Sequence, residues 1–346
     1  MRTPTLAVVA ALLIIAAFAT PAILAAEEDV SERVTVDNFR RAETDTYFEK
    51  FVKEDSLGKF LHQRALVPVE DQAVIRLNRD TLYSQAVFDL DAGPVTITLP
   101  DAGKRFMAMQ MIDEDHYTPQ VIYAAGSHTF ERSRSDTRYV LALIRIFANP
   151  NDPADMRAVH ELQDAIKVEQ KSAGEFEVPA WDQATLKQIR DALNALAAAN
   201  GALDSARMFG RKDQVEPVQH LLGTAAGWGG NPRETALYVG GAPKQNDGKT
   251  PYTLTVKDVP VDGFWSVSVY NKDGFFEKNA KNAYTINNVT AKPNADRSVT
   301  IRFGGDESAQ NMLPITPGWN YLVRLYRPRK EILDGTWKFP EAELAP

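Results

Sequence analysis

The chain has 346 residues, of which 44% are hydrophobic and 25% charged, with a formal net charge of −7 at pH 7 and no cysteine. This length predicts two domains, and the composition excludes both a disulfide-stapled miniprotein and a mainly disordered chain. The absence of thiols excludes disulfides, cysteine nucleophiles, thiolate metal sites and iron–sulfur clusters. An acidic chain without a concentrated basic face also argues against nucleic acid as a partner.

The first 26 residues have the pattern of a secretory signal peptide. Arg2 supplies a positive start, residues 6–19 are apolar and uncharged, and Ala25-Ala26 provide small residues before an acidic run. We therefore expect cleavage of residues 1–26, a periplasmic or secreted protein, and no stable membrane insertion afterwards. The alternative is a protein anchored by an uncleaved signal, because about 20 apolar residues can span a bilayer.

Past the signal, the pattern predicts an N-terminal domain over residues 27–150. Residues 37–53 have apolar side chains at helical spacing among charges. Between residues 73 and 146 the pattern changes to short β-rich runs separated by Gly, Pro and Asp. Such runs predict an antiparallel sandwich or barrel-like sheet.

The centre, residues 151–208, is predicted to be helical. Asp152-Pro153 is a helix-start signal, which predicts a helix from 152 to about 170. Its apolar stripe consists of Met156, Val159, Leu162 and Ile166. A second helix is expected over residues 182–200, before the capping Gly201. We expect the two helices to form a hairpin.

Residues 209–346 begin with a loop-rich bridge, over residues 209–241, and continue as a second β series. Alternation in residues 264–270 assigns Trp265, Val267 and Val269 to the core, and alternation in 320–326 places Arg324 on the same face as Tyr326. The predicted fold class is therefore mixed α+β, with two mainly antiparallel β-sandwich-like portions bridged by a helical hairpin.

Two sets of motifs resemble known domain families. The first set is residues 78–84 (NRDTLYS), Gly93-Pro94-Val95, Leu99-Pro100-Asp101 and Arg105-Phe106, and it resembles the domain-of-unknown-function family 1254. The second set is residues 263–266 (GFWS), Tyr270, Ala283-Tyr284, Arg324-Leu325-Tyr326 and residues 333–338 (LDGTWK), and it resembles family 1214. The resemblance implies β-sandwich-like portions flanking a helical segment, and it brings no established catalytic residues.

The strongest catalytic candidates follow the predicted strand 105–112. Asp113, Asp115 and His116 form an acidic turn, and carboxylates with a histidine that titrates near neutral pH can act as general acid and base. The same side chains offer oxygen and nitrogen ligands to a divalent cation, but we expect neither a metal nor another cofactor. The alternative is an exposed acidic turn without function. Standard nucleophile, phosphate-loop and metalloprotease motifs are absent from the sequence.

Candidate ligand-binding residues come from both β regions. Arg79 shares a face with Tyr83 if the strand is regular, and the two would contact a ligand carboxylate or hydroxyl. In the structural alternative, Asn78 and Asp80 hold backbone amides at a strand entry. The candidates are Arg79, Asp80, Tyr83, Tyr117, Trp228, Tyr270 and Arg324.

These observations favour an exported protein that binds a small molecule or glycan, or that serves an envelope role. One alternative is an extracytoplasmic hydrolase with carboxylate and histidine acid–base chemistry, and another is a structural assembly module. The sequence leaves homo-oligomer formation open. Convergence of Asp80, Asp113, His116, Tyr270 and Arg324 into one cleft would favour the enzyme.

Overall fold

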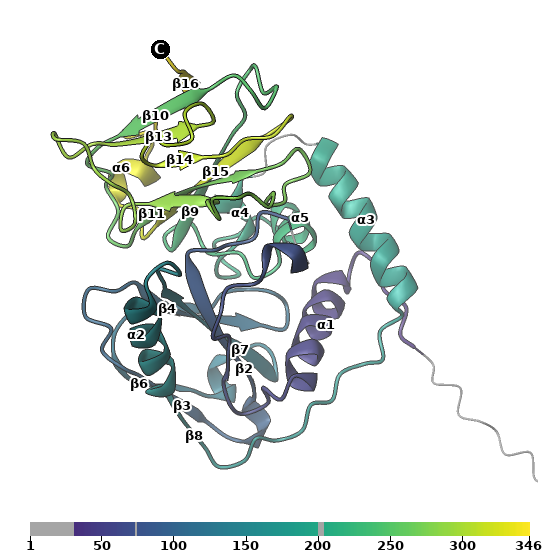
Figure 1. Cartoon of the computed structure of the whole chain (residues 1–346). Helices are drawn as coiled ribbons and strands as arrows, with labels where there is room; N and C mark the ends of the chain where they lie inside the picture. The colour runs from purple at the N-terminus through teal and green to yellow at the C-terminus, as the bar shows by residue number, and fades with distance from the viewer. Residues whose placement is uncertain (1–30, 73–74, 200–203) are drawn as a thin grey trace, which may run out of the picture.

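The computed structural model describes residues 31–72, 75–199 and 204–346. Two strand-rich portions, one from each half of the chain, lie one above the other, with helices along one side (Figure 1). This mixed α+β architecture of mainly antiparallel sheets confirms the predicted fold class. The predicted signal peptide, residues 1–26, lies outside the described residues.

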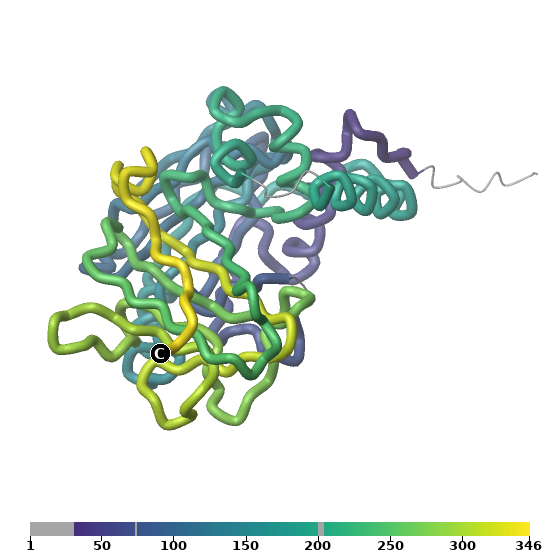
Figure 2. Tube along the Cα trace, turned by 90° about the horizontal axis from the view of Figure 1, so that it is seen from above, coloured from purple at the N-terminus to yellow at the C-terminus, as the bar shows by residue number. Residues whose placement is uncertain are grey.

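A group of helices lies beside the two portions. They are α1 (Phe39–Lys53), α3 (Gln183–Ala199), α4 (Ser205–Met208) and α5 (Pro217–Gly227). Helices α1 and α3 confirm two predicted helices, and the first described residues run beside α3, where the Val34 amide donates to Thr185 Oγ1 at 3.0 Å (Figure 2). The bridge expected to be loop-rich contains α5, because Pro217 begins a helix at a position where a missing N–H costs little.

The two central helices pack on different partners rather than as a hairpin. Helix α2 (Pro153–Asp164) places the fully buried Val159 against the core of the N-terminal portion. Helix α3 packs Leu186 and Leu193 in a separate core with residues of α1 and α5. An apolar stripe predicts that one face of a helix is buried, but it does not specify the partner.

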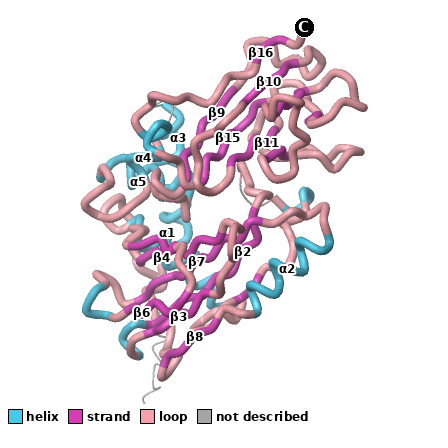
Figure 3. The backbone as a smooth tube through the Cα atoms, turned by 90° about the vertical axis from the view of Figure 1, so that its left-hand side faces the viewer, coloured by secondary structure: helices cyan, strands magenta, loops and turns pink. Residues whose placement is uncertain are grey.

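The N-terminal portion is a sandwich of two antiparallel sheets (lower half of Figure 3). Its strands are β1 (Leu61–His62), β2 (Thr81–Asp89), β3 (Val95–Leu99), β4 (Met107–Asp113), β5 (Gln120–Ile122), β6 (Gly126–Phe130), β7 (Tyr139–Phe147) and β8 (Lys167–Gln170). The larger sheet has the order β1-β2-β7-β4-β5, and the smaller has the order β6-β3-β8. Short single-turn 3₁₀ segments occur at Val69–Asp71, Leu90–Ala92 and Arg132–Arg134.

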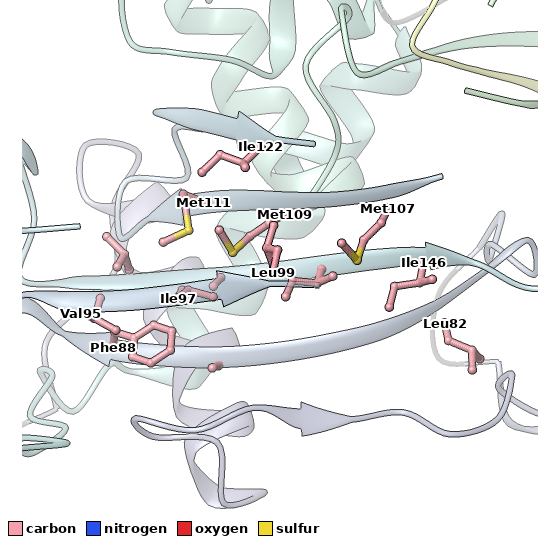
Figure 4. Packing of buried hydrophobic residues seen from close by; sticks show 14 of the residues in the cluster. Leu82, Phe88, Val95, Ile97, Leu99, Met107, Met109, Met111, Ile122 and Ile146 are labelled. Carbon is pink, nitrogen blue, oxygen red and sulfur yellow. The ribbon is translucent and has the colours of Figure 1, made fainter. Parts of the chain in front are cut away.

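Alternation along the strands builds the core between these two sheets. Met107, Met109 and Met111 of β4 point toward Ile97 and Leu99 of β3 (Figure 4). Successive strand residues face opposite sides, so one face of β4 supplies this core while the other face is free for different contacts.

Strand β8 replaces the end of the helix that was predicted to reach residue 170. Helix α2 ends at Asp164, and Lys167–Gln170 pairs antiparallel with β3. Val168 packs against the core, while Lys167 and Glu169 are exposed. The helix prediction failed here because β3 offers an open edge whose backbone groups bind the segment, a partner invisible to helical spacing.

The C-terminal portion is a second pair of packed sheets. Its elements are β9 (Ala236–Gly241), β10 (Tyr252–Val256), β11 (Trp265–Tyr270), β12 (Thr285–Asn287), β13 (Val299–Phe303), β14 (Met312–Leu313), β15 (Asn320–Tyr326), α6 (Lys330–Leu333) and β16 (Glu343–Leu344). The sheets have the orders β12-β11-β15-β9 and β14-β13-β10-β16, with only the β13–β14 pair parallel among the described strands. Trp265, Val267 and Val269 lie in the core, as predicted.

The two portions meet sheet to sheet. The outer face of the β2–β7–β4 sheet lies against the β9–β15–β11 sheet (Figure 3). Phe264 stacks on Tyr326 with ring centroids 4.2 Å apart, and Phe147 and Phe106 from the first portion pack on Phe264 at 4.8 and 5.3 Å. Such aromatic packing is worth roughly 0.5–1.5 kcal/mol per pair beyond the area it buries.

Arg324 provides a polar contact beside these aromatic rings. Its guanidinium is buried, at 2% exposed, and donates to Ser268 Oγ at 2.9 Å and to Tyr270 Oη at 2.7 Å. It also donates to the backbone carbonyl of Arg76 at 2.7 Å and to that of Leu77 at 3.2 Å. These last bonds attach the segment before β2 to strand β15, so one side chain joins the two portions.

We expect Arg324→Met to lower the free energy of unfolding by about 4 kcal/mol, because it removes a buried guanidinium that donates to the Arg76 carbonyl and to the hydroxyls of Ser268 and Tyr270. Urea denaturation measures the change. The control is Arg302→Met on β13, whose guanidinium bonds only an exposed carbonyl, that of Gln310 at 3.1 Å, and it should change stability by less than about 0.5 kcal/mol. Equal losses in both variants would contradict the joining role of Arg324.

Candidate functional site

The structure divides the predicted site residues between two groups. Asp80, Tyr83, Tyr270 and Arg324 lie in the contact between the portions. The acidic turn after β4 lies elsewhere, packed against α1 and α5, with Asp113, Asp115, His116, Tyr117 and Trp228 around it. The residues whose convergence would favour an enzyme therefore do not share one cleft.

In the contact between the portions, the Asn78 side chain forms hydrogen bonds with two tyrosines. Its Oδ1 accepts from the Asp80 amide at 2.9 Å, which confirms the structural role predicted for it at a strand entry. Its Nδ2 donates to the hydroxyls of Tyr83 at 3.2 Å and of Tyr326 at 3.0 Å. One amide thus bridges a tyrosine of each portion.

Arg79 points away from Tyr83, contrary to the prediction. It donates to the backbone carbonyl of Val67 at 2.6 Å, and its guanidinium lies 5.2 Å from the ring centre of Tyr284. The expected alternation fails because β2 begins only at Thr81, so Arg79 precedes the regular strand.

Asp80 is a fully buried carboxylate in the same contact. Its Oδ1 accepts from Asn287 Nδ2 at 3.2 Å, and its Oδ2 has no partner among the described residues. The charge of Asp80 acts to raise the pKa of the Arg324 guanidinium, together with the hydroxyls of Tyr270 and Tyr326 and against the effect of burial. The Asp80 charge therefore helps to keep the buried Arg324 guanidinium charged inside the contact.

Arg145 links this contact with the turn after β4. Its Nη2 donates to the Gly229 carbonyl at 2.7 Å, and its guanidinium lies 5.4 Å from the ring centre of Tyr83. Burial acts to raise the pKa of Tyr83, but the Arg145 charge and the Asn78 hydrogen bond outweigh it and lower that pKa overall. Gly229 in turn donates its amide to His116, so polar contacts run continuously between the two groups.

The turn after β4 is buried, which corrects the expectation of an exposed acidic turn. Asp113, Glu114 and His116 are 4%, 5% and 3% exposed. Asp113 Oδ1 accepts from the amides of Asp115 at 3.0 Å and Tyr117 at 2.9 Å, so this carboxylate holds the turn together. Burial nevertheless raises the pKa of Asp113 to about 7.

The hydrogen bonds of His116 define its tautomer. The Gly229 amide donates to Nε2 at 2.8 Å, so Nε2 carries no proton, and Nδ1 must donate to Thr224 Oγ1 at 2.9 Å. The Thr224 hydroxyl donates onward to the carbonyl of His220. The ring stacks between those of His220 and Trp228, with centroids 5.5 Å from each.

Beside this stack, Tyr117 and Trp228 also make structural contacts. The Tyr117 ring stacks on His220 at 4.4 Å, and its hydroxyl accepts from Arg40 at 3.2 Å. The Trp228 indole stacks on Tyr47 at 4.1 Å and donates to Thr44 Oγ1 on α1. Their roles as ligand-binding residues stay predictions.

A cleft of about 400 Å³ opens next to the buried turn. Helix α1, the turn after β4, the entry to β7 and the segment before α3 form its walls. The lining residues include Glu32, Arg41, Asp45, Glu114, Arg132, Asp136, Thr137, Arg138, Tyr139, Glu177, Val178, Pro179 and Trp181. A second cleft, of about 330 Å³, lies between the two portions, but the charged side chains lining it are exposed or half-buried.

Asp45 is a strongly perturbed carboxylate of the cleft beside the buried turn. The side chain is 1% exposed, its Oδ2 accepts from Trp181 Nε1 at 2.9 Å, and its Oδ1 is buried without a partner in the described part of the chain. Burial, with the charges of Glu114 and Asp115, raises the pKa of Asp45 to about 7, although Trp181 and Arg41 act to lower it. An acid or base poised near neutral pH in a cleft is typical of a functional site.

Glu114 and Arg41 are further charged residues that line this cleft with Asp45. Glu114 Oε2 accepts from the Tyr139 amide at 2.8 Å, and its Oε1 lies 3.9 Å from Arg41 Nη1. Arg41 makes its closer ion pair with Asp115, at 2.8 Å. Burial raises the pKa of Glu114 as well.

The sequence reasoning missed Asp45 and Trp181. Asp45 lies on α1 three residues after the buried Ala42 and three before the buried Phe48. The signal that the sequence offered for this site was therefore a carboxylate on the apolar stripe of a helix. Trp181 lies 136 residues away in the chain, and only the fold brings its indole to Asp45.

Among residues 31–72, 75–199 and 204–346, no group of three or more His, Asp or Glu side chains is placed to hold a metal ion. Within the same residues, no helix is long and apolar enough to cross a membrane.

The protein belongs to the class of folds with two antiparallel, sandwich-like portions. Each portion contains a match to a protein-family model. Residues 57–129 match the family described as "Protein of unknown function (DUF1254)", and residues 235–330 match "Protein of unknown function (DUF1214)". These two matches confirm the resemblances that the motifs indicated, in the predicted order. No curated protein matches the chain significantly.

Two solved structures share this fold. The VPA0106 protein from Vibrio parahaemolyticus superposes with a TM-score of 0.69 at 18% identity, over 90% of this chain and 98% of that one. A putative uncharacterized protein from Burkholderia cenocepacia gives a TM-score of 0.51 at 13% identity, over 89% of this chain and 88% of that one. At these identities the likeness concerns the fold alone.

We expect His116 to remain a neutral imidazole at pH 6, where an ordinary histidine is largely protonated. Burial, aided by the charges of His220 and Arg40, lowers its pKa well below the ordinary value of 6.5. The unfolded chain takes up this proton below about pH 6.5, so the contribution of His116 to stability is complete above that pH and declines as the pH falls. Nitrogen-15 NMR of the ring measures its protonation, with the urea-unfolded chain as control. An imidazolium signal at pH 6 in the folded protein would return His116 to the acid–base candidates.

We expect Asp45→Asn to be more stable than the wild type at pH 8, by about 1–3 kcal/mol. The folded protein holds the Asp45 proton up to about pH 7, whereas the ordinary pKa is 3.8, so wild-type stability falls as the pH rises between these values. Asparagine has no such proton and can still accept from Trp181. Urea denaturation should show the difference at pH 8 and its near disappearance at pH 4.5. A variant destabilised at pH 8 would contradict the raised pKa.

Proposed function

We propose that this protein is exported and binds a small organic molecule in the cleft between α1 and the turn after β4. The observation that carries the proposal is Asp45, which lines the cleft and whose buried Oδ1 has no partner among the described residues. A ligand donor would satisfy this oxygen, and removing the penalty of an unpaired buried acceptor contributes to affinity.

The dimensions and walls of the cleft support the proposal. Small-molecule sites usually have volumes of about 300–1,000 Å³, with apolar or aromatic walls and a few oriented polar groups. This cleft of about 400 Å³ places Trp181, Val178 and Pro179 beside the carboxylates of Asp45 and Glu114. Export rests on the signal-like residues 1–26.

Native mass spectrometry of the protein purified from its source envelope tests the proposal. We expect the folded wild type to carry a small molecule, and Val178→Trp to lose it because the larger side chain fills the cleft. The control is Val289→Trp, at a 56% exposed position outside the cleft, which should keep the molecule. A wild type without any bound molecule, or a Val178→Trp variant that keeps it in full, would contradict binding at this cleft.

One observation favours the alternative of a hydrolase. Asp45 and Glu114 both have raised pKa values and share the cleft, and such carboxylates can transfer protons near neutral pH. A hydrolase would convert the recovered molecule during incubation at pH 7, and Asp45→Asn would stop the conversion. Recovery of the unchanged molecule supports binding instead.

A further inference from the structure

The charge around the cleft indicates the class of its ligand. Five carboxylates line the cleft, against three guanidinium groups. The basic groups are also engaged by acids that do not line it: Arg41 pairs with Asp115 at 2.8 Å, and the other two arginines pair with Asp89 and Asp91 at 2.8 and 3.1 Å. Two of the five carboxylates have cations of their own, Glu177 in Arg138 at 3.0 Å and Asp136 in Lys212 at 3.4 Å, so the least compensated negative charge of the cleft belongs to Glu32, Asp45 and Glu114.

Asp45 and Glu114 are the buried carboxylates among the lining residues. Both are buried, and their one shared cation, Arg41, lies 3.9 Å from Glu114 Oε1 while bonding more closely to Asp115. One oxygen of Asp45 has no donor in the described part of the chain. A bound cation with N–H groups would satisfy the free oxygen and balance the charge at once.

We infer that the ligand carries a protonated primary amine, which binds Asp45 Oδ1 beside Glu114 while its organic part packs against Trp181. The inference rests on the proposed function and names its ligand class.

The geometry favours an ammonium over other cations. A guanidinium binds best to both oxygens of one carboxylate, but the Trp181 indole occupies the second oxygen of Asp45. An ammonium is a compact charge whose three donors can engage separate oxygens. A metal ion needs more ligands, and the described residues contain no suitable group of three.

Amine binding should release a proton near neutral pH. Burial is the main cause of the raised pKa of Asp45, and the Trp181 indole, the Glu114 and Asp115 charges and the Arg41 charge also act on this carboxyl. Its pKa of about 7 leaves it partly protonated before binding. The carboxylate form is the one that pairs with an ammonium. Affinity should therefore rise about tenfold from pH 6 to pH 8, the factor for one linked proton with a pKa near 7.

The test uses isothermal titration calorimetry of the folded protein with phenethylamine, which is an ammonium ion at these pH values, and with its neutral counterpart 2-phenylethanol. We expect the wild type to bind the amine at least tenfold more tightly than the alcohol at pH 8. Asp45→Asn should weaken amine binding at least tenfold, leave alcohol binding unchanged, and abolish the pH dependence. The control Asp136→Asn removes an exposed charge at the cleft, already 3.4 Å from Lys212, and should change affinity less than twofold.

The outcomes separate this inference from the proposed function. Equal affinities for amine and alcohol, or an unchanged Asp45→Asn variant, would overturn the amine class while leaving small-molecule binding intact. If the wild type fails to bind phenethylamine but carries a molecule that Val178→Trp loses, the amine class is wrong and the proposed function stands. If the wild type carries no molecule and binds no amine, both fail.

Discussion

The burial of Arg324 is the constraint on which the arrangement of the two portions depends. A guanidinium removed from water must have its hydrogen bonds restored by the protein, and here two hydroxyls and the backbone carbonyls of Arg76 and Leu77 do so. Those carbonyls precede β2, so the bonds position the strand that lies between β1 and the central β7 in the first sandwich's larger sheet. The aromatic rings beside Arg324 add buried apolar area to the contact between the two portions. The polar bonds determine how the portions are aligned.

The same sheet separates the two groups of polar residues. One end of its outer face meets the C-terminal portion, and the other end is covered by α1, which leaves the turn after β4 buried between helices. Burial explains why Asp113 and His116 serve the turn itself: each exchanges hydrogen bonds with nearby backbone or hydroxyl groups. It also explains Asp45, whose raised pKa and unpaired oxygen lower stability at neutral pH. Groups that reduce stability in this way are common at functional sites.

Much of the fold could be predicted from local pattern. Period-two alternation placed Trp265, Val267 and Val269 correctly because successive side chains of a strand face opposite sides, although β11 proved to be buried on both faces. Prediction failed where a distant partner decided the outcome. Residues 167–170 form a strand because they pair with the open edge of β3. Helix α3 packs on α1 and α5, and not on α2, because its apolar stripe is buried there. Arg79 was misplaced because the regular strand begins two residues later.

The candidate site, too, could be predicted only in part from the sequence. The composition, the signal-like start, the motifs of both domain families and the acidic turn could all be read from the chain. The cleft could not, because Asp45, Glu114 and Trp181 belong to separate segments that meet only when α1 packs beside the sheet and residues 177–181 run past it. Whether a carboxylate is an ordinary surface charge or a group poised near neutral pH depends on the burial and neighbouring charges that this packing creates.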